Sequence, residues 1–251
     1  MRRQRLDLLL ELTRHEVTVS YKGSVLGLAW SQAAVAMQFF VLTVLFTRVV
    51  DLGIEHYPAF LLIGLVAWQL FSTGMTAGTQ SLVQGRDLFR TPRIPAWLLP
   101  SAAVGAALTR FVLAVPLLVV VLAITVGMPT MHVVAIPLVL AVQLLVIAGP
   151  AVLLGAAHVR YRDVGHLVGV VLVPLFYLTP VFYPPERVPD GLSVLVTINP
   201  MAHVITAYRD ILIAGQWPDA GLGVVALVHA AILVAALFML ERARTSLVDL
   251  L

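Results

Sequence analysis

Charged residues are scarce in this sequence, and the motifs on which many enzymes depend are missing from it. There is no cysteine, which excludes disulfides and thiolate metal sites. The seven histidines stand singly, without an H-E-x-x-H motif or a carboxylate cluster at metal-ligating spacing, so no metal site is expected. No G-x-x-x-x-G-K-S/T loop is present to hold nucleotide phosphates. We therefore expect neither catalytic residues nor a cofactor in this chain.

Apolar residues, in contrast, are abundant. Hydrophobic residues make up 60% and charged residues only 12% of the sequence, and the mean hydropathy is +0.98. A water-soluble domain of this length would expose large apolar patches with such a composition, so an integral membrane protein is expected. The net charge of +3 arises from basic residues at the ends of apolar runs, where membrane topology accounts for them. No nucleic-acid partner is expected.

Apolar runs long enough to cross a bilayer recur along the chain. A hydrocarbon core of roughly 30 Å requires about 20 apolar residues in a helix. We predict an all-α integral membrane protein with a single transmembrane domain over residues 1–251. Its six transmembrane helices are predicted at residues 25–48, 58–80, 100–126, 133–157, 165–183 and 219–240.

The basic residues predict the orientation of these spans. An even number of spans places both termini on one side of the membrane, and twelve of the sixteen Lys and Arg residues fall on that side. The opposite side has Arg187 and Arg209, with Arg48 at its border. Because cytoplasmic loops are enriched in Lys and Arg, both termini are predicted to be cytoplasmic.

Residues 1–22 have the pattern of a helix at the membrane surface. Leu6, Leu9, Leu10, Thr13 and Val17 form one stripe at helical spacing, and the remaining positions are rich in charge. Those charges interrupt the apolar core that a secretory signal needs. We predict a cytoplasmic amphipathic helix at the interface, and a solvated charged tail is the alternative.

Two segments do not fit a plain bundle. Residues 184–218 are apolar but are broken by proline and glycine into pieces too short to span, which indicates a re-entrant helical hairpin on the extracytoplasmic side. An ordinary loop is the alternative.

In residues 84–95, charges alternate with Leu88 and Phe89 before Pro92, which suits a short helix that docks in a cleft of a soluble partner. Any basic cytoplasmic loop has a similar pattern.

Six segments in the same order resemble the membrane subunit of the polysaccharide-export ABC transporters, the family that moves O-antigen, capsule, teichoic acid and related lipid-linked glycans. They are YKGSVLGLAW at residues 21–30, GLVAWQLFS at 64–72, the 88–100 link with its PRIP and LLP, HVRYRD at 158–163, TPVFY at 179–183 and the NPM to YRD segment at 199–210. The likeness covers nearly the whole chain. Gln69 stands where Asn is more usual, and the link is Arg-rich rather than Lys-rich.

This resemblance implies a permease subunit in a bacterial plasma membrane that exports a lipid-linked polysaccharide. Two copies would form a channel at their interface, and two copies of a separate nucleotide-binding subunit would bind ATP and Mg in the cytoplasm. The link residues implied to contact that partner are Arg86, Asp87, Leu88, Phe89, Arg90 and Arg93, together with the N-terminal helix. The implied extracytoplasmic gate lies at 190–213 and includes Asn199, Pro200, Tyr208 and Arg209.

Aromatic side chains could line a glycan path, because their rings offer apolar faces to sugar C–H groups while Tyr and Trp keep a polar atom. Aromatic residues near the ends of spans can equally be interface anchors. The candidates are Trp30, Phe39 and Phe40 in the first span and Phe176, Tyr177, Phe182 and Tyr183 at the fifth.

Arg110 is a charged residue well inside the third predicted span. An uncompensated charge there would cost about 2.5–3.5 kcal/mol on insertion scales. Arg110 could bind the pyrophosphate of a lipid carrier, since arginine binds phosphate with two hydrogen bonds. Alternatively, its side chain extends to the cytoplasmic interface.

Two other functions remain open from the sequence. An ABC exporter of drugs or small lipids would have a route without room for sugars. A membrane-embedded polyprenyl-phosphate transferase would need acidic metal-binding motifs on a cytoplasmic loop, where only the isolated Asp87 and Asp163 occur. A proton-driven transporter is disfavoured, because the spans lack the buried Asp or Glu of a proton relay.

Overall fold

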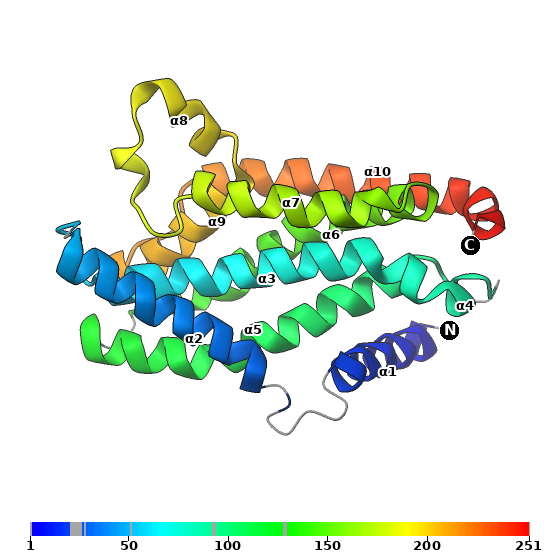
Figure 1. The fold of residues 1–251 in the computed structure, drawn as a ribbon, viewed down its shortest axis with the longest axis horizontal. Coiled ribbons are helices and arrows are strands. Elements are labelled where there is room, and N and C mark those ends of the chain that lie inside the picture. Colours follow the sequence, from blue (N-terminus) through cyan, green and yellow to red (C-terminus); the bar gives the residue numbers. More distant parts are fainter. Residues whose placement is uncertain are drawn as a thin grey trace.

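The computed structural model describes residues 2–20, 27, 29–50, 52–91, 94–127 and 130–250 (Figure 1). Residues 21–26 and 28 of the first family-like segment and the predicted contact residue Arg93 lie outside this set. Helices form nearly all of the described chain, and no strand occurs among these residues, so the predicted all-helical class is confirmed.

The helices follow one another in this order: α1 (Arg2–Ser20), α2 (Ala29–Val44), η1 (Leu45–Val49), α3 (Tyr57–Gln84), α4 (Arg86–Phe89), α5 (Leu98–Thr125), η2 (Met131–Ala135), α6 (Ile136–Arg160), α7 (Asp163–Leu178), η3 (Pro185–Arg187), α8 (Asp190–Thr197), α9 (Pro200–Arg209), η4 (Asp210–Ala214) and α10 (Gly221–Asp249). The η1 and η4 segments are π-helical turns.

Five helical stretches are long and apolar enough to cross a membrane, and they match five of the six predicted spans. They are Gln32–Val49, Tyr57–Gln84, Leu98–Thr125, Met131–Arg160 and Gly221–Asp249. The sixth, predicted at 165–183, is the shorter apolar helix α7, which ends at Leu178. Thr179 precedes Pro180 and has an extended backbone, because a residue before proline is disfavoured in the helical conformation.

Helix α3 lies at the centre of the bundle and contacts α2, α5, α6, α7 and α9. In its most apolar 18-residue window 78% of residues are buried, against at most 33% in the other spans. Gly74 and Gly78, one turn apart, let α6 approach closely. A Cβ atom at either glycine would lie 2.8 Å from a side-chain carbon of Ile147 or Ala151, respectively. Such small residues allow membrane helices to pack backbone against backbone.

The segment between α7 and α10 contains two short helical pieces, Gly191–Thr197 and Pro200–Ala214, which meet at 77°. Asn199 ends the first piece and caps the second, since its side chain accepts a hydrogen bond from the Met201 amide at 2.9 Å. The segment is therefore helical and not an irregular loop, and its bend fits both a broken span and the predicted re-entrant hairpin.

The N-terminus, the C-terminus and α4 gather at one end of the long axis, and α8 and η4 lie toward the other (Figure 1). Helix α1 packs on α5, where a Cβ atom at Gly105 would lie 2.9 Å from the Thr13 hydroxyl. The α1 side chains Leu6 and Leu10 remain exposed. The N-terminal segment is therefore a packed helix rather than a solvated tail.

Candidate functional site

A polar groove of about 390 Å³ opens between α1, α3 and α5, in the half of the bundle nearer the termini. Its floor is a stripe of polar side chains on α3 that recur every four residues, and therefore share one face of the helix. Glu16 of α1 and Arg110 of α5 complete it. The α3 side chains of the stripe are Ser72, Thr76, Gln80 and Gln84, and Thr73 lies beside them.

Arg110 thus reaches a polar groove from within a span. Its backbone carbonyl accepts a hydrogen bond from Gln32 Nε2 at 2.9 Å, which joins α2 to α5 at the same level. Hydroxyl and amide groups can exchange hydrogen bonds with sugar hydroxyls, and the guanidinium can bind an anionic oxygen. The groove therefore offers hydrogen-bonding groups of both charges and of none to a polar group inside the membrane.

The aromatic residues predicted around the end of the fifth span come together at the opposite end of the bundle. The ring of Phe182 lies 5.8 Å from Phe176, 6.0 Å from Tyr177 and 5.0 Å from Tyr183. Phe46 of η1 stacks on Phe182 at 5.7 Å. Phe46, Tyr177, Phe182 and Tyr183 line one side of a pocket of about 420 Å³ whose other side is α8.

The three aromatic residues predicted in the first span do not join this cluster. Trp30 and Phe40 are 58% and 65% exposed on α2, and Phe39 is half-buried against the core. The rotation of α2 turns Trp30 and Phe40 outward, and an apolar sequence does not indicate that rotation. Phe46, six residues beyond Phe40, is the aromatic residue of the first span that joins the cluster around Phe182.

The predicted gate residues fasten α9 to the rest of the bundle. Arg209 is 7% exposed, and its guanidinium donates to the carbonyls of Phe60, Pro180 and Val181. The bonds to Pro180 and Val181 are 2.7 and 2.6 Å long, and the guanidinium also lies 3.4 Å from the centre of the Phe60 ring. Backbone carbonyls thus compensate this buried cation and tie α9 to α3 and to the chain after α7.

Two further bonds hold the same helix. Asn199 donates to the Thr179 hydroxyl at 2.8 Å, and Pro200 occupies the first turn of α9. The Tyr208 hydroxyl donates to Gln143 Oε1 at 3.0 Å, and Gln143 Nε2 donates to the Ala67 carbonyl at 2.7 Å. A buried chain of hydrogen bonds therefore joins α9, α6 and α3.

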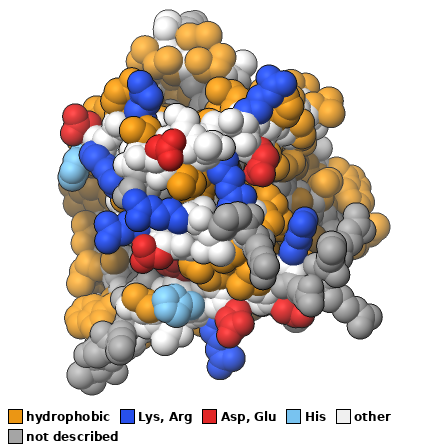
Figure 2. All heavy atoms as spheres, turned by 90° about the vertical axis from the view of Figure 1, so that its right-hand side faces the viewer, with side chains coloured by type: hydrophobic (Ala, Val, Ile, Leu, Met, Phe, Trp, Pro, Cys, Tyr) orange, Lys and Arg blue, Asp and Glu red, His pale blue; other side chains and the backbone are white. Residues whose placement is uncertain are grey.

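Helix α4 lies at the basic end, where arginine side chains gather over the surface (Figure 2). Arg86 and Asp87 are 62% and 89% exposed, and Arg90 is exposed beside them. Leu88 is half-buried. Phe89, predicted to contact a partner, is only 1% exposed because its ring fills this chain's own core, so it anchors α4 instead of projecting from it.

Arg244 of α10 is a residue that the sequence argument missed. Its guanidinium donates to the carbonyls of Thr91 and Ile94 at 3.0 and 2.7 Å, and to that of Phe89 at 3.4 Å. It therefore fixes the backbone that follows α4. The other missed residues are Phe46, Gln143 and the polar stripe of α3, of which the last was detectable from its four-residue spacing.

The family model of the ABC-2 type transporter matches residues 7–213. The chain is 36% identical over 216 residues to the O-antigen export system permease protein RfbA of Myxococcus xanthus, a match that covers 85% of this chain and 83% of that protein. A Klebsiella pneumoniae protein of the same name is 28% identical over 83% of this chain and 81% of its own length.

A shorter match concerns the daunorubicin resistance ABC transporter permease protein DrrB1 of Streptomyces coeruleorubidus, which is 40% identical over 55 residues, or 21% of this chain and 19% of that protein. The two O-antigen permeases, in contrast, each match more than four fifths of this chain. The family match, the relatives and the apolar helical bundle agree, and the chain belongs to the ABC-2 type transporter family as a multi-pass membrane permease subunit.

Proposed function

We propose that this chain is the channel-forming permease of an ABC transporter that exports a lipid-linked polysaccharide across the bacterial plasma membrane. Two copies pair, and two copies of a separate cytoplasmic subunit hydrolyse ATP with Mg. Both termini and α4 face the cytoplasm, in keeping with the positive-inside rule. The names of two relatives that match more than four fifths of the chain support the substrate class.

The polar groove is the observation that carries the proposal. A hydrophobic small molecule needs no hydroxyl and amide stripe in a membrane span, where polar side chains are costly. A glycan head group does need one, and the stripe from Ser72 to Gln84 offers hydroxyl and amide groups to its sugar hydroxyls. The aromatic cluster at the other end of the bundle offers ring faces to sugar C–H groups.

ATP-driven closure of the partner subunits would push on the exposed α4. Phe89 and Arg244 fasten α4 to α10 and to the core beneath it, so the push would pass to the bundle instead of bending the link. The docking contacts themselves fall to the exposed Arg86, Asp87 and Arg90, and Arg93 is proposed with them from the sequence.

Groove variants test the substrate proposal. Thr76→Leu replaces a groove hydroxyl by an apolar side chain and should lower the amount of glycan at the cell surface by about tenfold, the effect of losing about 1.4 kcal/mol. Thr109→Leu is the matched control, because both hydroxyls donate to the carbonyl four residues earlier, but Thr109 does not line the groove. Equal export by the two variants would contradict the role of the groove.

Coupling is tested separately, with the purified complex of this chain and its ATPase. Replacing Arg86 and Arg90 by alanine should lower ATP turnover or release the partner, whereas Arg48→Ala, exposed toward the opposite end, should change neither. Failure of any ATPase to bind would instead refute the ABC-exporter mechanism and turn attention to the transferase alternative.

A further inference from the structure

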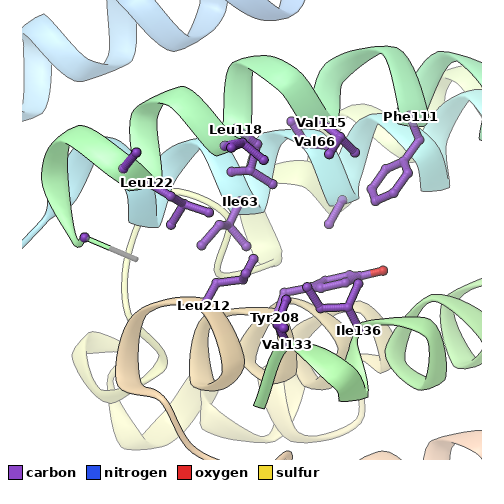
Figure 3. A pocket seen from close by; sticks show the side chains of 14 residues that line it. Ile63, Val66, Phe111, Val115, Leu118, Leu122, Val133, Ile136, Tyr208 and Leu212 are labelled. Atoms are coloured by element: carbon purple, nitrogen blue, oxygen red, sulfur yellow. The ribbon is translucent and has the colours of Figure 1, made fainter. Parts of the chain in front are cut away.

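A second cavity, of about 250 Å³, lies in the half of the bundle away from the termini (Figure 3). It is bounded by α3, by α5, by the start of α6 and by the consecutive segments α9 and η4, which we call the hairpin arm. Four side chains on one face of α5 line its length: Phe111, Val115, Leu118 and Leu122. It does not share a lining residue with the polar groove.

The lining excludes water as a stable occupant. Among the described lining residues, Tyr208 alone has a polar side-chain atom, and its hydroxyl already donates to Gln143 at 3.0 Å. A buried water needs about two to four hydrogen-bond partners, and cavities without them stay dry. The occupant must therefore be apolar.

The cavity follows α5. Its lining on that helix runs from Phe111 to Leu122, and these residues of a helix extend over about 16 Å.

The rim of the cavity faces the bilayer. Val119 of α5 and Val133 of η2 line it and are 56% and 41% exposed. Both belong to stretches that are long and apolar enough to span, so the medium outside this rim is lipid hydrocarbon. A lipid chain that enters between α5 and η2 leaves the hydrocarbon of the bilayer and meets the apolar lining of the cavity.

We propose that this cavity is a binding site for a single hydrocarbon chain of a membrane lipid, which lies along α5 and packs against Tyr208 and Leu212 of the hairpin arm. An empty cavity of this kind forfeits the dispersion contacts of its lining. The occupant fills the space beneath α9 and η4 and thereby stabilises their position. A phospholipid acyl chain and the isoprenoid chain of a glycan carrier both have the apolar character that this cavity requires. The site does not depend on which substrate is exported.

Photolabelling of the full-length protein in lipid nanodiscs tests this site. One sample contains phosphatidylethanolamine with a diazirine at the end of one acyl chain, and a second contains a polyprenyl phosphate with a diazirine in its chain. Adducts are mapped by peptide mass spectrometry. Ile63, only 2% exposed, lines the cavity and reports occupancy from inside it.

Matched variants separate the cavity from the general lipid surface. Val119→Trp obstructs the rim, and Val115→Trp fills the interior, so each should lower labelling at Ile63 at least about fivefold. Val120→Trp is the control for the rim, because Val120 is 54% exposed next to Val119 but does not line the cavity. Its labelling should stay within about twofold of the parent protein. Equal thermal stability of Val119→Trp and Val120→Trp excludes misfolding as the cause.

The two samples identify which kind of lipid chain occupies the cavity. Labelling by the phosphatidylethanolamine alone assigns the site to acyl chains, labelling by the polyprenyl phosphate alone assigns it to a carrier, and labelling by both supports a site for either. Absence of an adduct at Ile63 with both probes overturns the proposal. So does equal labelling in both rim variants and in Val115→Trp.

Discussion

Replacing Arg209 by methionine should destabilise the protein strongly. The guanidinium is the donor to the carbonyls of Pro180 and Val181, which lie outside the helices, and the substitution would leave both oxygens buried without it. Each such loss costs about 1–3 kcal/mol, so the two together amount to roughly 2–6 kcal/mol. The carbonyl of Phe60 belongs to α3 and retains its position in that helix, so it is left out of the sum.

The measurement is the melting temperature of the purified protein in detergent. A change of 1 kcal/mol shifts the melting temperature of a chain of this size by about 2–4 °C, so a fall of at least about 4 °C is expected. Arg187→Met is the control, because Arg187 is an exposed arginine that donates to one carbonyl, that of Leu52. Arg209→Lys keeps the charge but lacks the planar fork and should also be destabilised. A melting temperature of Arg209→Met within about 1 °C of the parent protein would refute the reasoning.

Three further changes test neighbouring contacts. Gly64→Ala should cost about 1–3 kcal/mol, because its Cβ would lie 2.5 Å from the Val181 carbonyl oxygen, and a lower melting temperature checks this. Asn199→Ala should cost about 0.5–2 kcal/mol through loss of the α9 cap, and Asn199→Ser, which keeps an accepting oxygen and adds no buried charge, should melt at a higher temperature than Asn199→Ala. Arg244→Gln should lower export more than it lowers ATPase activity of the complex, because the backbone after α4 loses its fixed position; equal losses would contradict a role in coupling.

The helical class and the positions of most spans could be predicted from the sequence, because a bilayer sets the length of an apolar run. The end of the fifth span could not be predicted as accurately as the other spans. The 179–183 segment is apolar enough to continue, but Pro180 and the Arg209 contacts with the carbonyls of Pro180 and Val181 hold it outside the helix. The apolarity of residues 179–183 therefore does not indicate where helix α7 ends.

The site residues were harder to predict, since helix rotation decides what a side chain contacts. A helix that is apolar on all sides gives no amphipathic signal for its orientation. Trp30 and Phe40 are therefore predicted from the sequence and Phe46 is missed, although of these three only Phe46 reaches the aromatic cluster. Phe89 lay in a charged link that suggested exposure, and tertiary packing buried it. The cost of placing a charge in lipid indicated that Arg110 needs a polar environment, and the residue lines the polar groove; whether it binds a carrier phosphate stays a prediction.

The central claim is that this permease and an ATPase partner move a lipid-linked glycan across the membrane. The most direct measurement uses the purified complex in proteoliposomes loaded with fluorescent lipid-linked O-polysaccharide, with the fraction exposed to an external glycosidase recorded over time. The account predicts movement that requires ATP and that stops when the partner subunit cannot hydrolyse it. A complex that hydrolyses ATP but leaves the glycan on its original side of the membrane would contradict the account.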